Sequence, residues 1–120
     1  FVLVAESAEA GEVPTPVGFV HVLEIDGHAH LEQLSVLPSF GRRGIGRRLV
    51  DAALAAARHR GHALITLRTY ADVPWNAPFY ASCGFIESEP GSDFHRRLVA
   101  TEDALELAIH GRRLQMTAVL

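Results

Sequence analysis

A loop rich in glycine and arginine is the part of this chain whose residue types best suit chemistry. The segment from Gly41 to Arg48 reads GRRGIGRR, between an apolar stretch that ends at Pro38 and a helix predicted over residues 43–59. The first N–H groups of a helix have no partner inside it, so a helix start attracts anions. Glycines let phosphate oxygens approach the backbone without a Cβ in the way. The pattern predicts a phosphate-binding loop, with a glycine-eased turn beside solvated arginines as the alternative.

Two common nucleotide-binding motifs are excluded by the residues of this loop. A P-loop requires Gly-Lys-Ser/Thr, whereas Gly46 is followed by two arginines. The dinucleotide fingerprint is G-x-G-x-x-G, whereas the spacing here is Gly41-x-x-Gly44-x-Gly46. If the loop binds phosphates, they therefore belong to another class of ligand.

The elements that must position this loop follow from hydrophobic periodicity and turn residues. Predicted strands cover about residues 1–5, 17–25, 28–37, 63–69, 85–87 and 113–120, and predicted helices cover about 43–59, 72–82 and 101–110. Asp26-Gly27 predicts a tight turn between antiparallel strands, and the acidic stretch 6–16 predicts a hairpin loop. Thr101, followed by two acids, predicts the N-cap of the last helix. The result is an α/β (α+β) fold, a mixed sheet with helices on its faces.

Composition narrows the class of protein. The 120 residues are enough for one domain with a core, and the net charge of −3 argues against a protein that coats nucleic acid. A single cysteine, Cys83, excludes an internal disulfide and fits a reducing compartment, so we expect a cytoplasmic location. No apolar run approaches the roughly 18 residues of a membrane helix. His28 and His30 share a strand face, but no third ligand is visible, so we expect no metal.

Two blocks of sequence resemble the GNAT superfamily of acyl-CoA N-acyltransferases. GRRGIG, from Gly41 to Gly46, is similar to the family's Gln/Arg-x-x-Gly-x-Gly/Ala signature, with Gly41 departing at the first position. PWNAPFYASCGF, from Pro74 to Phe85, resembles the family's helix that ends in Tyr-x-x-x-Gly-Phe. The resemblance implies a mostly antiparallel sheet with a V-shaped splay. It also implies that residues 1–120 are a single domain without the family's first strand and two helices.

The same resemblance implies that acetyl coenzyme A is the cosubstrate. Its pantetheine arm would lie along the splayed strand like an added strand. Its pyrophosphate would rest on amides of the glycine–arginine loop. The cofactor-binding residues implied in this way are Leu34, Ser35, Val36, Gly41, Arg42, Arg43, Gly44, Ile45, Gly46 and Arg47. Asn76 either contacts the cofactor or is the N-cap of the helix that follows.

Candidate catalytic residues lie beside the expected thioester. An alkyl amine with a pKa near 10.4 is neutral in only about one molecule in 2,500 at pH 7, so a base must supply the free amine. Glu32 is the first candidate and His30 the second, on the same face if no bulge intervenes. Glu32 is alternatively a solvent-facing strand residue. Tyr80 matches the family's tyrosine that protonates the leaving thiolate, or is a half-buried aromatic whose hydroxyl bonds to the backbone.

These residues predict an acetyl-CoA-dependent N-acetyltransferase that acts on a small amine, a peptide N-terminus or a lysine. A non-catalytic acyl-CoA-binding or regulatory module on the same fold is the alternative. Nucleic-acid binding through the arginines of the loop is disfavoured by the acidic balance elsewhere and by the lack of an aromatic platform. We expect no membrane partner, and a homodimer is possible because the family often dimerises.

Overall fold

In the computed structural model, which describes residues 1–8 and 11–120, the chain folds around one six-stranded sheet. The strands of the described chain are β1 (Val2–Ser7), β2 (Thr15–Ile25), β3 (His28–Val36), β4 (Leu64–Tyr70), β5 (Ile86–Ser88) and β6 (Arg113–Val119). The helices in the same ranges are α1 (Ile45–His59), α2 (Ala77–Ser82) and α3 (Asp93–Ala104), with short 3-10 turns at Pro38–Phe40 and Leu107–His110. None of the described helices is both long and apolar enough to span a membrane.

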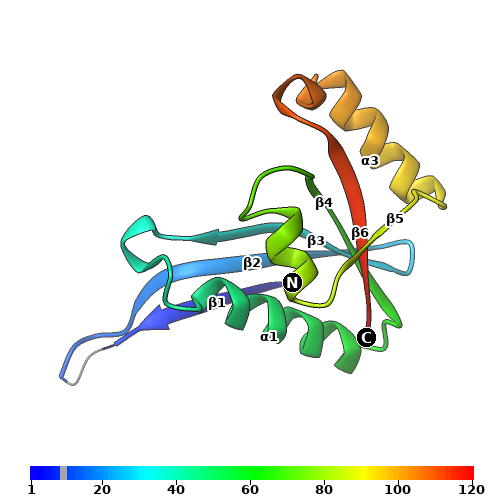
Figure 1. The fold of residues 1–120 in the computed structure, drawn as a ribbon. Helices are drawn as coiled ribbons and strands as arrows, with labels where there is room; N and C mark the ends of the chain where they lie inside the picture. The colour runs from blue at the N-terminus through cyan, green and yellow to red at the C-terminus, as the bar shows by residue number, and fades with distance from the viewer. Residues whose placement is uncertain (9–10) are drawn as a thin grey trace.

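The strand order is β1-β2-β3-β4-β6-β5, and only the β3–β4 pair is parallel (Figure 1). The predicted mixed sheet with helices on both faces is therefore confirmed. Asp26 and Gly27 have φ values of 53° and 79°, which is the left-handed pair that a two-residue hairpin turn requires. The predicted loop 6–16 is shorter than expected because β1 extends to Ser7 and β2 begins at Thr15, and its residues 9–10 lie outside the described residues.

The last helix was predicted in the wrong place. α3 begins at Asp93, not near Thr101, and its N-cap is Ser92, whose Oγ accepts the N–H of His95 at 3.1 Å. Thr101 lies inside the helix, where its hydroxyl donates to the carbonyl of Arg97 at 3.0 Å. A threonine can satisfy its hydroxyl on the preceding turn, so it need not mark a helix start. The predicted helical residues 107–110 form a separate 3-10 turn. The second helix also begins later than expected, at Ala77.

The two faces of the sheet differ in polarity. On one face, apolar strand residues pack against α1 and α2; this core contains Ala29, Leu31, Ile65, Leu67, Leu114, Met116, Ala118, Leu49, Val50, Ala53, Ala57, Ala77 and Tyr80. The alternate strand positions form the second face, which lies under α3. There, His28 stacks on Phe94 with ring centroids 5.4 Å apart, and His30 meets the same ring edge-on.

A β-bulge interrupts β3. His21 lies opposite Gln33 and Val22 lies opposite Leu31, so Glu32 has no partner on β2. The extra residue changes the alternation of side chains, so that Leu31 and Leu34 both reach the core.

The sheet also splays between β3 and β4. These parallel strands pair only through Ala29–Ile65 and His30–Thr66, and then they diverge (Figure 1). The backbone groups of β3 that face β4 beyond this point have no strand partner within the described sheet. The V-shaped opening that the sequence predicted is therefore present.

Candidate active site

The glycine–arginine loop presents a run of free amides at the start of α1. Before this run, the Gly41 N–H donates a hydrogen bond to the Pro38 carbonyl at 3.1 Å. After it, the Arg48 N–H donates the first hydrogen bond of the helix to the Gly44 carbonyl at 3.0 Å. Between these bonds, in the described structure, the N–H groups of residues 42–47 have no hydrogen-bond partner. Unpaired amides at a helix start are suited to hold a diphosphate.

The backbone of this loop turns in left-handed conformations. Arg42 has φ 62° and Gly44 has φ 74°. Gly44 is the residue immediately before α1 and offers no capping side chain, and the first turn of α1 contains no acid. The Arg43 guanidinium lies 4.9 Å from the centre of the Phe40 ring, which holds its charge beside the loop. The local charge is therefore positive and favours an anion.

The end of β3 lies against the start of α1. A Cβ added to Gly46 would lie 3.9 Å from the side chains of both Leu34 and Val36, and 3.7 Å from the ring of Phe79. The structure thus brings the predicted pantetheine strand, residues 34–36, next to the predicted phosphate loop, residues 41–47. A long ligand could lie along the opening of the sheet and end at the loop.

The structure brings the two candidate bases together despite the bulge. Glu32 Oε2 lies 3.9 Å from His30 Nε2, and the Glu32 side chain is 46% exposed whereas that of His30 is 3% exposed. His30 Nδ1 is within hydrogen-bond distance of Thr66 Oγ1 at 2.8 Å. Burial, with a smaller effect of His95, lowers the pKa of His30 to about 4. His30 is therefore neutral near pH 7, and Glu32 is the accessible carboxylate.

Tyr80 projects from α2 into an aromatic cluster. Its ring contacts those of Phe79 and Phe85 at centroid distances of 5.2 and 5.8 Å, and the residue is 9% exposed. Burial raises the pKa of Tyr80 to about 12, with a smaller effect of Cys83. The Tyr80 hydroxyl takes part in none of the side-chain hydrogen bonds within residues 1–8 and 11–120, whereas the Tyr70 hydroxyl donates to the Leu107 carbonyl at 3.2 Å. The hydroxyl is thus protonated and has no backbone partner in the described chain.

Asn76 occupies the N-cap position of α2, but its side chain makes no capping hydrogen bond. Nothing in its geometry assigns the amide to the helix. In the described ranges, no group of three or more His, Cys, Asp or Glu side chains is placed to hold a metal ion.

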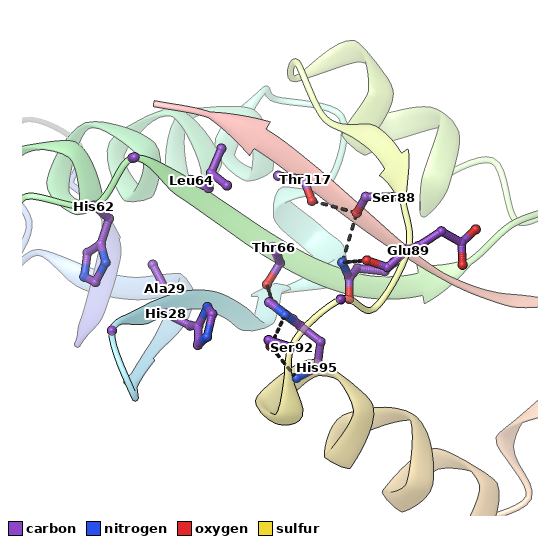
Figure 2. A pocket seen from close by; sticks show the side chains of 14 residues that line it. His28, Ala29, His62, Leu64, Thr66, Ser88, Glu89, Ser92, His95 and Thr117 are labelled. Atoms are coloured by element: carbon purple, nitrogen blue, oxygen red, sulfur yellow. Dashed lines mark hydrogen bonds between the residues drawn. The ribbon is translucent and has the colours of Figure 1, made fainter.

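A polar network under α3 was not anticipated from the sequence. Thr66 Oγ1 lies 2.8 Å from His30 Nδ1 and 3.1 Å from His95 Nε2, and His95 Nδ1 lies 2.6 Å from Ser92 Oγ. Figure 2 shows Thr66, His95 and Ser92 pointing toward one another at the edge of a pocket of about 390 Å³. The period-two polar pattern of β4 was the available signal, but the chain segments that it meets are far apart in sequence.

Comparison with known proteins identifies the family to which this chain belongs. The sequence profile of the acetyltransferase (GNAT) family matches residues 1–85. The fold is similar to that of Rv2747 from Mycobacterium tuberculosis in complex with CoA, with TM-score 0.71 and 21% identity over 99% of this chain and 75% of that one.

Two further solved structures share the fold. A protein assigned as a streptothricin acetyltransferase of Bacillus anthracis, in complex with acetyl coenzyme A, matches with TM-score 0.66 and 21% identity over 88% of this chain. The PaiA N-acetyltransferase of Thermoplasma acidophilum, in complex with coenzyme A, matches with TM-score 0.62 and 20% identity, also over 88% of this chain. This chain spans 56% and 55% of their respective lengths. With the family profile covering more than half of its residues, the chain belongs to the GNAT acetyltransferase family.

Proposed function

We propose that this chain transfers an acetyl group from acetyl coenzyme A to a primary amine. The observation that carries the proposal is the run of free amides at residues 42–47, which lies directly beside the splayed end of β3. A diphosphate fits the amides and the arginines, and a pantetheine arm, which has two amides of its own, fits the unpaired edge of β3. The two features lie close together, because Gly46 packs against the side chains of Leu34 and Val36.

The residues assigned to the cofactor divide into two groups by the kind of contact. Main-chain groups of Leu34, Ser35 and Val36 would pair with the arm, and amides from Gly41 to Arg47 would hold the phosphates. Asn76 stays a weaker prediction, since its side chain is not committed to a cap. When bound, acetyl coenzyme A supplies an activated acetyl thioester.

Glu32 would accept the proton of the incoming ammonium group. The bulge removes Glu32 from the β2–β3 pairing, and its side chain is accessible. A carboxylate beside the reacting nitrogen stabilises loss of the proton in the transition state, an effect typically worth about 10²–10⁴-fold. His30 Nε2, which is 3.9 Å from Glu32, would orient this carboxylate or a water between them.

Tyr80 would donate a hydrogen bond from its hydroxyl to the leaving sulfur. Because burial raises the pKa of Tyr80 to about 12, the group stays protonated throughout the neutral range. A thiol has an ordinary pKa of about 8.5, so the thiolate is a weaker base than the Tyr80 phenolate. The phenol would therefore act mainly by donating a hydrogen bond to the negative charge that develops on sulfur, and any proton that passes to the sulfur is replaced from solvent. Unlike the hydroxyl of Tyr70, that of Tyr80 makes no side-chain hydrogen bond in the described chain that would compete with this role.

The proposal is tested by titration with acetyl coenzyme A and by thiol release with a panel of amines. Tyr80→Phe should lower kcat by about 10²-fold or more while leaving cofactor affinity unchanged. Tyr70→Phe is the matched control, because the Tyr70 hydroxyl bonds to the Leu107 carbonyl instead. Glu32→Gln should lower kcat/KM most at neutral pH, and the loss should shrink as pH approaches the pKa of the amine.

The alternative is a module that binds acyl-CoA without catalysis. Tight binding of acetyl coenzyme A with no thiol release for any amine would favour it. Failure of acetyl coenzyme A to bind at millimolar concentration would reject both functions. A cytoplasmic location and a homodimer stay predictions.

A further inference from the structure

A small pocket under α3 carries an unusual arrangement of charge. Its volume is about 190 Å³, and its walls come from β3, β4, β6 and the α3 region. Arg68 and Arg113 both bind Glu102: Arg68 Nε lies 2.8 Å from Oε2, and Arg113 Nε lies 3.0 Å from Oε1. The three side chains are only 10%, 17% and 14% exposed, respectively. Arg68, Arg113 and Glu102 thus form one poorly exposed cluster of charges.

The cluster has one positive charge more than Glu102 can neutralise. Burial raises the pKa of Glu102, but hydrogen bonds from Arg113 and Arg68 outweigh this and lower it, so the carboxylate is ionised. His30, in the same pocket, is neutral near pH 7, so it adds no further positive charge and does not change this excess of one. A poorly exposed guanidinium without a full counter-charge is costly, and a second anion would relieve that cost.

The mouth of the same pocket carries a negative charge instead. Glu32 also lines it, and the Glu32 side chain is 46% exposed. One pocket therefore contains an accessible carboxylate near the splay and an excess cation deeper under α3. This pattern is complementary to a molecule with an ammonium group at one end and an anion at the other.

We propose that the acceptor is a small amino acid-like molecule, a primary amine that also carries a carboxylate. The inference rests on the proposed function, since it assigns the amine to Glu32. The carboxylate would bind Arg68, whose Nε is engaged by Glu102 while its two terminal nitrogens have no hydrogen bond in the described chain. A guanidinium and a carboxylate form a strong charge-assisted pair. The pocket is smaller than the roughly 300–1,000 Å³ of typical drug-sized sites, which favours a metabolite over a peptide.

The test compares each acid with its own amide. Glycine, β-alanine and γ-aminobutyrate are assayed beside glycinamide, β-alaninamide and γ-aminobutyramide, and the acid-to-amide ratio of kcat/KM is measured. Wild type should favour at least one acid by about 10-fold or more. Arg68→Gln should lower that ratio by about 10- to 100-fold, mainly through KM. Comparing the ratio between variants cancels the intrinsic difference in amine pKa between acid and amide.

Two further variants separate recognition from folding. Arg68→Lys keeps the charge and should retain part of the acid preference. Arg112→Gln is the matched control, because Arg112 forms an exposed pair with Glu87 and does not line the pocket; its ratio should equal that of wild type. Circular dichroism and coenzyme A affinity verify that each variant is folded.

Equilibrium binding makes the outcome independent of turnover. Each acid and amide is titrated calorimetrically into wild type with and without coenzyme A. If wild type binds or acetylates acids and amides equally, or if Arg68→Gln weakens both to the same extent, the proposed acceptor class is wrong. A failure of coenzyme A to bind would instead overturn the proposed function, while the acid–amide comparison would still decide this inference.

Discussion

The two faces of the sheet follow the same period-two alternation but are buried in different ways. The α1–α2 face of β3, β4 and β6 is apolar, with Leu31, Leu67 and Met116 among its core residues. The α3 face is covered only in part, and its buried residues include His30, Thr66 and Gln115. The α1–α2 face is held mainly by apolar packing, whereas the α3 face needs a hydrogen-bond partner for each of the several polar groups that it buries.

The two faces therefore contribute differently to the protein: the apolar face mainly stabilises the fold, and the α3 face holds most of the buried ionisable groups. The apolar face fixes the positions of α1 and α2, and so of the loop amides and Tyr80. The α3 face holds ionisable groups in a poorly solvated setting, where their interactions are stronger than in water. Even there the satisfaction of polar groups is incomplete, since Gln115 Oε1 is buried without a hydrogen-bond partner in the described structure. We expect mutations to affect the two faces in different ways.

The largest effect should come from the apolar face. Leu67→Ala, at a residue that is 1% exposed, should lower the free energy of unfolding by about 2–5 kcal/mol, because it removes core contacts and leaves a cavity. Leu64→Ala on the same strand, where Leu64 is 50% exposed, should cost about 1 kcal/mol or less. Urea denaturation measures both values. Equal losses would contradict the assignment of the core to this face.

The next effect is a pH dependence that belongs to the α3 face. The pKa of His30 is about 4 in the folded protein, below its ordinary value of 6.5, so the unfolded chain binds more protons between these limits. The contribution of neutral His30 to the free energy of unfolding is therefore complete above pH 6.5. It is lost as pH falls toward 4, and the loss reaches about 3 kcal/mol. Burial also lowers the pKa of His95, which acts in the same direction.

Urea denaturation between pH 4 and 8 measures this loss. In His30→Gln the dependence of stability on pH should be weaker, whereas in His59→Gln, at an exposed position on α1, it should match wild type. An unchanged pH dependence in His30→Gln would show that this histidine is not the group responsible.

The smallest effect concerns the start of α3. Ser92→Ala removes the side chain that accepts the His95 N–H, and it should cost about 1 kcal/mol. Thr101→Ala, inside the helix, should change stability by about 0.5 kcal/mol or less. Thermal unfolding of the two variants gives the comparison. A larger loss of stability in Thr101→Ala than in Ser92→Ala would support the helix start near Thr101 that the sequence predicted.

Local patterns were sufficient to predict most of the fold. The strand order along the chain, the Asp26-Gly27 turn and the end of α1 at His59 depend on neighbouring residues, and the structure confirms them. The start of α3 was missed because Ser92 and Thr101 offer similar capping chemistry, and only the tertiary contacts of Phe94 and His95 with His28 decide between them.

For the candidate site, the sequence predicted the arrangement of the backbone but not the contacts between side chains. The amides of residues 42–47 follow from a loop and a helix start, which the sequence indicates directly. The contact between Arg68, Glu102 and Arg113 could not be predicted from the sequence. Its members come from three elements, and Arg113 lies 45 positions after Arg68 in the chain. Side-chain partners at that separation are set by the fold and leave no local pattern.

The bulge at Glu32 has a consequence for how this domain could diverge. Glu32 does not pair with β2, and its side chain is largely outside the core, so neither strand pairing nor close packing restricts the residue type at this position. This residue can therefore change while the fold is retained. Its presence is not free to drift, because deleting it would turn Leu34 and Val36 away from the interior. Related lineages could thus exchange the side chain at this position without rebuilding the protein.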